Sequence, residues 1–219
     1  MSITECKAIH QGLVGGDPLA FLSENIIITG TGSQTDFPTS AARLLDFENM
    51  GSTGNGGSYY SLTTDDMARI INGYLPTYYL PWGRDTGYYV ILDPDDGPDI
   101  MMTASMTGCS VGYVRSGDGA VRVSHHNVFS PRTSEMDKAQ KTTLQFAKNT
   151  FHPSEYFRED FESTDKVVFK GDGMGFVFGV RHKRHWTMYA QTVYQQKKTD
   201  AWTAKVILSD ISVKDVRVF

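Results

Sequence analysis

The sequence predicts one α/β domain over residues 1–219, built as a sandwich of mixed, largely antiparallel β-sheets flanked by helices. The chain has 219 residues, 40% of them hydrophobic, which is enough for one sizeable core, and no linker marks a second domain. Its 21 glycines, its 12% aromatic residues and its short runs of Val, Ile, Tyr and Thr favour sheets over a helical bundle. Amphipathic stretches between these runs predict the helices.

The N-terminal part predicts one helix and two strands. Thr4 can cap a short helix that runs to about Leu13, where glycines follow. The β-branched run at 24–29 predicts a buried strand. The segment 40–48 fits either period, and we interpret it as one strand. The glycine-rich segment 51–58 predicts a loop, and it lacks the Gly-Lys-Ser/Thr ending of a phosphate-binding loop.

Two further helices are predicted where a cap precedes an apolar stripe. Met67, Ile70 and Ile71 recur at helical spacing after two threonines and two aspartates, so we expect a helix over 65–74. A second amphipathic stretch begins with a serine cap and predicts a helix over 134–149.

The remaining segments alternate apolar and polar residues and predict strands. Four aspartates at 93–99 are typical of a turn, and Ala104 stands where a calcium loop needs a bidentate glutamate, so we expect a hairpin turn there. A second turn is expected at Gly117-Asp118-Gly119. The expected strands are 88–92, 100–106, 110–115, 120–124, 166–170, 174–183, 186–196 and 202–213.

Cys109 lies at the seam between two of these strands, and the pair His125–His126 lies at the end of the next one. A thiol becomes a strong nucleophile as a thiolate, and a histidine within hydrogen-bond reach lowers its pKa and carries the proton, so we expect alkylation below about pH 8. Neighbouring strands lie about 5 Å apart, so the side chains can meet. Gly108 lets a carbonyl approach the backbone N–H of Cys109, which predicts an oxyanion donor at Gly108 and Cys109.

The choice between the two histidines depends on strand parity. Val121, Val123 and His125 share one face of an extended strand, and His126 lies on the other. Cys109 shares the apolar face of its own strand, which favours His125. A bulge within the strand would reverse this choice and favour His126.

The run Thr103-x-x-Met106-Thr107-Gly108-Cys109 resembles the Thr-x-x-Leu-Ser-Gly-Cys signature of the glutamine deamidase toxins related to cytotoxic necrotizing factor and Burkholderia lethal factor. The resemblance extends to Leu80-Pro81-Trp82 before the cysteine and to the Gly-Asp-Gly turn and histidine after it, with weaker similarity at Met188-Tyr189 and Ala201-Trp202. It implies a CNF-type deamidase fold. The chain departs from the pattern of this family in two ways: it has a second histidine, and the spacing between the cysteine and the histidine is longer.

The resemblance also implies roles. Cys109 is expected to be the nucleophile, His125 (or His126) the general base and acid, and Thr103 the residue that orients the histidine. A glutamine carboxamide of a host protein would be converted into a carboxylate, without a cofactor, by a secreted effector that acts in the host cytosol. A translation initiation helicase is one candidate target, and Trp82 is a candidate for the substrate groove.

Three alternatives stay open. A papain-like cysteine protease uses the same pair of side chains, but its cysteine begins a helix, and a bacterial chemoreceptor deamidase has a similar arrangement in a shorter chain. A non-catalytic binding module would keep the fold and bury Cys109 as a small apolar residue.

The charge balance bears on partners. The net charge of -4 and the pI near 5.8 argue against a nucleic-acid ligand. No stretch reaches the roughly 18 apolar residues of a membrane span, and the first residues lack the pattern of a classical signal peptide, so we expect a soluble protein. The basic run 181–185 beside Trp186 predicts a solvated hairpin, or else a docking patch for an acidic partner. No metal site is expected at His182 and His185, because no cysteine or acidic cluster joins them.

Overall fold

A computed structural model gives the fold of the chain. It describes residues 4–29, 41–45, 47–52, 57–62, 75–83, 86–127, 147, 149–151, 173–199 and 204–216. The helical segments of this part are α1 (Thr4–His10), the π-helical turn η1 (Gln11–Gly15) and α2 (Pro18–Glu24). Its strands are β1 (Ile26–Ile28), β2 (Ala41–Leu45), β3 (Phe47–Ser52), β4 (Ser58–Leu62), β5 (Leu75–Leu80), β6 (Thr86–Leu92), β7 (Ile100–Thr103), β8 (Ser110–Arg115), β9 (Val121–Asn127), β10 (Asn149–Phe151), β11 (Gly173–His182), β12 (His185–Thr199) and β13 (Ala204–Val216).

Within the described residues these strands form three sheets. A six-stranded sheet has the order β13-β12-β11-β7-β5-β2, a four-stranded sheet the order β10-β8-β9-β6, and a three-stranded sheet the order β1-β4-β3. Neighbouring strands are antiparallel except in the pairs β1·β4 and β5·β7, which are parallel. The predicted fold class, a sandwich of mixed and largely antiparallel sheets with helices outside, is confirmed.

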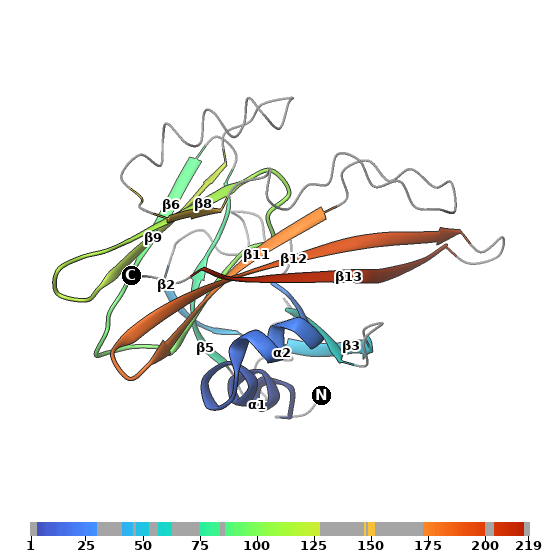
Figure 1. Cartoon of the computed structure of the whole chain (residues 1–219), viewed down its shortest axis with the longest axis horizontal. Helices are drawn as coiled ribbons and strands as arrows, with labels where there is room; N and C mark the ends of the chain where they lie inside the picture. Colours follow the sequence, from blue (N-terminus) through green and yellow to red (C-terminus); the bar gives the residue numbers. More distant parts are fainter. Residues whose placement is uncertain are drawn as a thin grey trace.

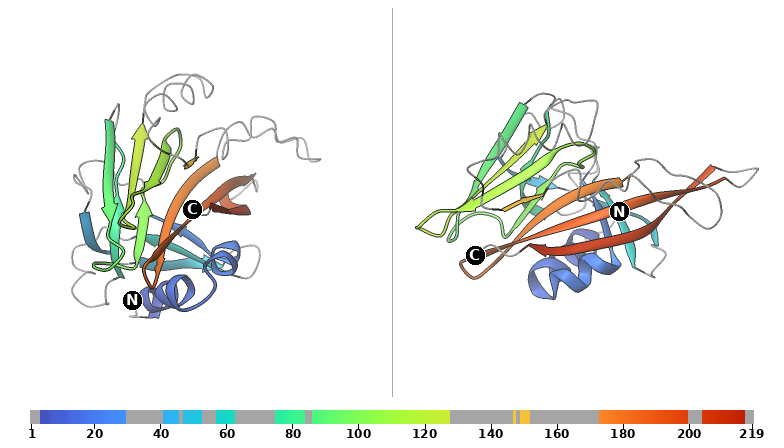
Figure 2. Two further views of the ribbon diagram at one scale, coloured as in Figure 1. Left: turned by 60° about the vertical axis from the view of Figure 1, so that its left-hand side comes forward. Right: turned by 45° about the horizontal axis from the view of Figure 1, so that its top comes forward.

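The six-stranded sheet is the middle layer of the molecule. The four-stranded sheet lies against one of its faces, and α1 and α2 lie against the other (Figures 1 and 2). Alternate residues of the middle strands therefore serve two cores. Met101 and Val177 pack toward the four-stranded sheet, whereas Met102 and Phe178 pack toward the helices.

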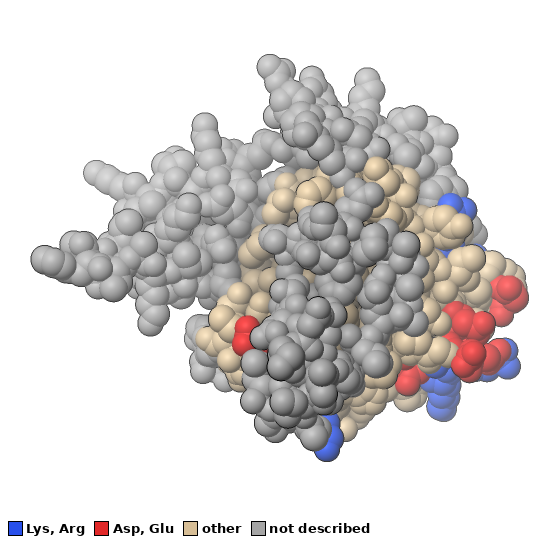
Figure 3. Space-filling view, turned by 180° about the vertical axis from the view of Figure 1, so that it is seen from behind, with Lys and Arg blue, Asp and Glu red and all other residues tan. Residues whose placement is uncertain are grey.

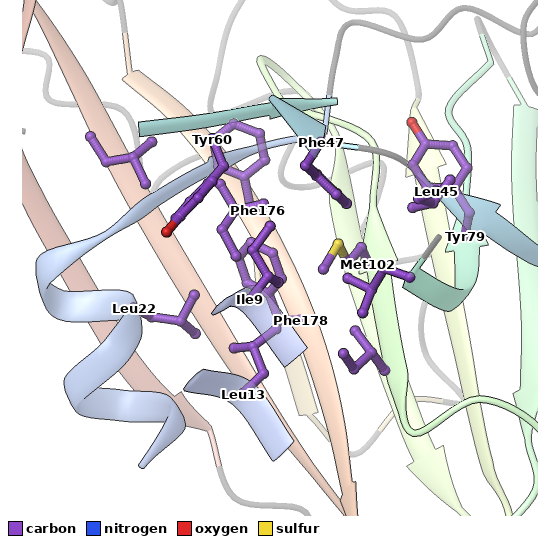
Figure 4. Packing of buried hydrophobic residues seen from close by; sticks show 14 of the residues in the cluster. Ile9, Leu13, Leu22, Leu45, Phe47, Tyr60, Tyr79, Met102, Phe176 and Phe178 are labelled. Carbon is purple, nitrogen blue, oxygen red and sulfur yellow. The ribbon is translucent and has the colours of Figure 1, made fainter. Parts of the chain in front are cut away.

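Each face of the middle sheet has its own core. In the core on the helix side, Leu13 and Leu22 point from the helical segments toward Phe176 and Phe178 (Figure 4). We call the other one the intersheet core. Its buried members are Leu80, Val90, Leu92, Met101, Met106, Cys109, Val111, Tyr113, Val121, Val123, Phe151, Val177, Trp186, Met188 and Ala190.

Polar side chains fix α2 to the sheets. Asp17 caps α2 by accepting from the backbone N–H groups of Leu19 and Ala20, and Pro18 fits the first turn because it lacks an N–H. At the other end, the buried Gln191 of β12 donates to the carbonyls of Leu22 and Asn25. One side chain thus holds the end of α2 against the middle sheet.

Several predicted elements need correction. The first predicted helix is found as α1 and η1, but α2 was missed. The segment 40–48 is not one strand, because β2 belongs to the six-stranded sheet and β3 to the three-stranded one. The predicted strand 100–106 ends at Thr103. Asn149 begins β10 and does not end a helix.

Other predicted elements are found, or lie outside the described residues. The strands predicted at 24–29, 88–92, 110–115, 120–124, 174–183, 186–196 and 202–213 correspond to β1, β6, β8, β9, β11, β12 and β13. The predicted loop at 51–58 is shorter, since β3 runs to Ser52 and β4 begins at Ser58. The predicted helix 65–74, residues 134–146 and the predicted strand 166–170 lie outside the described residues.

The aspartate-rich turn and the basic run neutralise each other at one end of the molecule (Figure 3). Arg181 donates to the Asp99 carboxylate at 2.8 Å and to the carbonyls of Asp93, Asp96 and Gly97. The buried Trp186 donates to the Asp93 carbonyl. Asp93–Asp99 is not a hairpin turn as predicted, because it connects β6 of the four-stranded sheet to β7 of the six-stranded sheet.

The basic run forms the exposed turn of the β11–β12 hairpin, as predicted, and a docking role for it stays a prediction. Arg184 lies 2.6 Å from an Asp95 carboxylate oxygen, so it shares its charge with the aspartate-rich turn. Trp186 is in the intersheet core and offers no surface ring to a partner. In the described ranges, no helix has the length and apolar character needed to cross a membrane.

Candidate functional site

The β8–β9 hairpin sets the faces of the candidate residues. Its register pairs Ser110 with His126 and Val111 with His125, and it runs on to Arg115 without a shift. Directly opposed residues share a face, so His125 points to the same side as Val111, into the space between the two large sheets. Cys109, which precedes β8, is buried in the intersheet core on that side. The bulge that would have favoured His126 is absent from this hairpin.

The chain reaches Cys109 through an irregularity at the end of β7. Phe178 of β11 pairs with Met102, but the next backbone pair joins Gly175 to Met106, so β7 contributes one extra residue to the ladder. The Thr103 hydroxyl takes the place of a backbone acceptor by accepting from the Val177 N–H at 3.1 Å. The chain can therefore leave the regular ladder before Cys109 while the Val177 N–H keeps a hydrogen-bond partner.

The hydrogen bonds of Thr103 do not match the role predicted for it. Thr103 was expected to orient the histidine, but its hydroxyl bonds to Val177 on β11, and its carbonyl accepts from the hydroxyl of Thr29. Neither ring nitrogen of His125 has a hydrogen-bond partner. In this structure Thr103 therefore positions the backbone that leads to Cys109, and it does not hold the imidazole.

The Cys109 thiol is held in its neutral form. Its residue is 5% exposed, and burial raises its pKa to about 12, while a backbone hydrogen bond from Thr107 acts in the opposite direction. This environment favours the thiol and not the low-pKa thiolate expected from the sequence. Cys6 is equally buried and lies near the carbonyl of Leu45, so it does not approach Cys109 as a disulfide partner.

His125 is also neutral. It is 1% exposed, and burial lowers its pKa to about 4. The carbonyls of Leu80 and Pro81 raise the pKa, although neither forms a hydrogen bond of normal geometry with the ring, and His126 lowers it. A buried imidazole with two unpartnered nitrogens is unfavourable unless another molecule satisfies it, because an unmade buried hydrogen bond costs roughly 1–3 kcal/mol.

His126 occupies the other face of the four-stranded sheet. It pairs with Gly87 of β6, and a Cβ on that glycine would lie 2.4 Å from the His126 Cε1 atom, so the ring lies across β6 where a side chain is missing. Burial and Arg122 lower the His126 pKa. Cys109 lies on the intersheet side, so His126 is the less suitable partner.

Three aromatic side chains pack on the intersheet core without being fully buried: Tyr78, Trp82 and Tyr88. Tyr88 is the register partner of His125 on β6, so it shares the histidine's face. A Cβ at Gly83 would lie 2.8 Å from the Tyr88 ring, which places this ring against the segment after β5. Tyr88 could not be predicted as a site residue, because the β6–β9 register has no local signal in the sequence.

The remaining predicted site residues lie in the same region. Gly108 and Cys109 are buried beside the start of β8, and their role as oxyanion donors stays a prediction. Trp82 is half-buried and packs on both cores. Among the described His, Cys, Asp and Glu side chains, no group of three or more is placed to hold a metal ion.

The fold of the chain is similar to that of a bacterial toxin domain of known structure. The crystal structure of the C-terminal domain of CNFy from Yersinia pseudotuberculosis aligns with 98% of this chain and 100% of its own length, with 12% sequence identity and a TM-score of 0.45. No family model matches the chain. No curated protein matches it either.

Proposed function

We propose that the chain is a cysteine-dependent protein glutamine deamidase, with Cys109 as the nucleophile and His125 as the general base and acid. The observation that carries this proposal is the buried, unpartnered imidazole of His125 on the same side of the four-stranded sheet as the buried thiol. A neutral imidazole offers one donor and one acceptor. A primary carboxamide can accept a hydrogen bond from the ring N–H or donate one to the other ring nitrogen, which an apolar ligand cannot do.

The reaction would start from a neutral pair of groups. As the Cys109 sulfur bonds to the carboxamide carbon, the thiol proton passes to a ring nitrogen of His125 and the carbonyl π electrons move onto oxygen. Backbone N–H groups near Gly108 and Cys109 would stabilise that oxyanion. The tetrahedral intermediate collapses by cleavage of the C–N bond, and the imidazolium gives its proton to the leaving ammonia.

Water completes the cycle. It attacks the thioester and gives a proton to the now neutral His125, and cleavage of the C–S bond returns that proton to the sulfur. The balance is glutamine plus water to glutamate plus ammonia. The carbonyls of Leu80 and Pro81 favour the protonated ring, so they would stabilise the imidazolium while it exists.

The substrate would be a glutamine on the surface of a host protein. Conversion would add one negative charge to that protein. A secreted effector that acts in the host cytosol fits this reaction, and a translation initiation helicase remains one candidate target from the sequence resemblance alone.

The test is mass spectrometry of proteins in a eukaryotic cell lysate treated with the purified chain. We expect wild type and His126→Ala to convert a glutamine into glutamate and release ammonia. We expect Cys109→Ser to give no conversion, and His125→Ala to lower the rate by roughly 100-fold or more, the usual contribution of a general base. Conversion by Cys109→Ser, or equal rates for the two histidine variants, would refute the proposal.

A non-catalytic binding module is the second candidate, because the burial and raised pKa of Cys109 also suit a structural thiol. The same lysate experiment distinguishes the two, since a binding module converts no glutamine. A papain-like protease is disfavoured because Cys109 precedes strand β8, whereas that family places its cysteine at the start of a helix.

A further inference from the structure

The Cys109–His125 pair has one flank that the mechanism does not use. Across the face of the four-stranded sheet, His125 on β9 lies between Val111 on β8 and Tyr88 on β6. Val111 is fully buried, and Cys109 precedes it on that side. Tyr88 is only half-buried, so on the other flank the described structure reaches solvent.

The segment after β5 forms the second wall of this flank. The carbonyls of Leu80 and Pro81 face His125, and the half-buried Trp82 follows them. Gly83 receives the ring of Tyr88, since a Cβ there would lie 2.8 Å from Cε2 and 3.2 Å from the hydroxyl oxygen. The missing side chain at residue 83 thus lets Tyr88 lean from β6 across to the Trp82 segment.

We propose that Tyr88, together with Trp82, forms an aromatic wall beside His125 that holds the aliphatic part of the substrate glutamine. This rests on the function proposed above and names a specificity-determining residue for it. The third half-buried aromatic of the core, Tyr78, lies elsewhere, because its hydroxyl is against Gly97 in the aspartate-rich turn.

The chemistry of glutamine fits such a wall. Its carboxamide needs polar partners, which His125 supplies, but the two methylenes before it are apolar and are stabilised by contact with aromatic faces. A smaller carboxamide without these methylenes gains nothing from the wall. Tyr88 therefore matters for a glutamine-like ligand and not for a minimal one.

Two electrophiles separate these cases by the rate at which each labels Cys109, measured by peptide mass spectrometry. One is N-blocked 6-diazo-5-oxo-norleucine methyl ester, a glutamine analogue. Its diazo carbon accepts the thiol proton, loses dinitrogen and bonds to sulfur. The other is iodoacetamide, a carboxamide without the glutamine chain. The sulfur bonds to its methylene carbon, iodide leaves, and the thiol proton passes to His125.

We expect Tyr88→Ala to lower the rate with the glutamine analogue by roughly tenfold, the effect of losing about 1.4 kcal/mol of contact. Its rate with iodoacetamide should be unchanged or higher, because the site becomes more open. Tyr88→Phe should stay close to wild type, since it keeps the ring. Tyr89→Ala, on the same strand but on the opposite, exposed face, is the matched control.

Gly83→Ala provides a second variant in case Tyr88→Ala does not fold, because its Cβ displaces the Tyr88 ring without removing it. Like Tyr88→Ala, Gly83→Ala should lower the labelling rate with the glutamine analogue relative to that with iodoacetamide. Equal losses with both electrophiles, a Tyr88→Phe rate as low as that of Tyr88→Ala, or a wild type with no preference for the analogue would overturn the inference.

Ammonia release from lysate proteins, measured in parallel, keeps the two proposals apart. If the wild type releases no ammonia but labels faster with the analogue in a way that depends on Tyr88, the proposed function is refuted and the aromatic wall is supported. If the wild type releases ammonia and Tyr88→Ala slows labelling by both electrophiles equally, the aromatic wall is refuted and the proposed function is supported.

Discussion

His125 is the most unusual single residue of the described structure, because it is buried, titratable and unpartnered. Its pKa is lowered from 6.5 to about 4 by burial, so the folded state takes up a proton later than the unfolded state as the pH falls. As far as His125 is concerned, the folded state therefore has its full stability above pH 6.5 and loses stability as the pH falls through 4.

We predict an acid sensitivity that depends on this ring. Between pH 7 and pH 4 the free energy of unfolding should fall by about 3 kcal/mol through His125, since each pKa unit corresponds to about 1.4 kcal/mol. His125→Phe, which keeps an aromatic ring without a titrating group, should reduce this loss, and His126→Gln should not reduce it as much. Urea denaturation at several pH values measures the effect. An unchanged acid loss in His125→Phe would contradict it.

The Cys109 thiol leads to a second prediction, opposite to the one made from the sequence. With a pKa near 12, the thiol should react slowly with iodoacetamide at pH 7. The labelling rate should keep rising with pH toward 12 and should show no plateau near neutral pH. Urea-unfolded protein, in which both cysteines are exposed, is the control and should react much faster. A plateau of fast labelling near neutral pH would show a thiolate in the resting site.

At the scale of elements, Thr103 illustrates how a side chain repairs a defect in a sheet. Its hydroxyl serves the Val177 N–H at the irregularity between β7 and Met106. We predict that Thr103→Val destabilises the fold by roughly 1–3 kcal/mol, the usual effect of leaving a buried N–H unpaired, while Thr103→Ser has a smaller effect. Chemical denaturation measures both, and equal losses would contradict this role.

The elements also show what sequence reasoning can reach. Local patterns predicted the β8–β9 hairpin and the parity that selects His125, because both depend on residues close in sequence. The helix α2 could have been found from Asp17-Pro18, an N-cap followed by a proline in the first turn. The contact of Thr103 could not, because it depends on the pairing of β7 with β11, a strand far along the chain.

For the whole molecule, the aspartate-rich turn is one link between the two large sheets, from β6 to β7. Arg181 holds this turn through four oxygen atoms at the end where the β11–β12 turn lies. The contact between the acidic and basic runs could not be predicted from the sequence, because the two runs lie far apart in the chain. Arg181 and Arg184 pair with this turn, while His182, Lys183 and His185 of the same run are exposed.

We predict that Arg181→Lys lowers the free energy of unfolding, because lysine lacks the planar fork that reaches several acceptors. Catalysis should stay nearly unchanged, because Arg181 lies near one end of β11, whereas Gly175 near the other end pairs with Met106, which leads to Cys109. Arg184→Lys, whose ion pair is exposed and of small value, is the matched control. Thermal denaturation and ammonia release measure the two properties. A loss of activity without a loss of stability would contradict this assignment.

The position of β7 in the middle of the six-stranded sheet has a consequence for folding kinetics. One neighbour, β5, is made just before it, but the other, β11, is synthesised much later. Pairings between distant segments slow folding, so we expect refolding on the order of milliseconds to seconds, measurable by tryptophan fluorescence after dilution from urea. Until β11 emerges from the ribosome, one edge of β7 is open, and a nascent or partly translocated chain is then most exposed to aggregation.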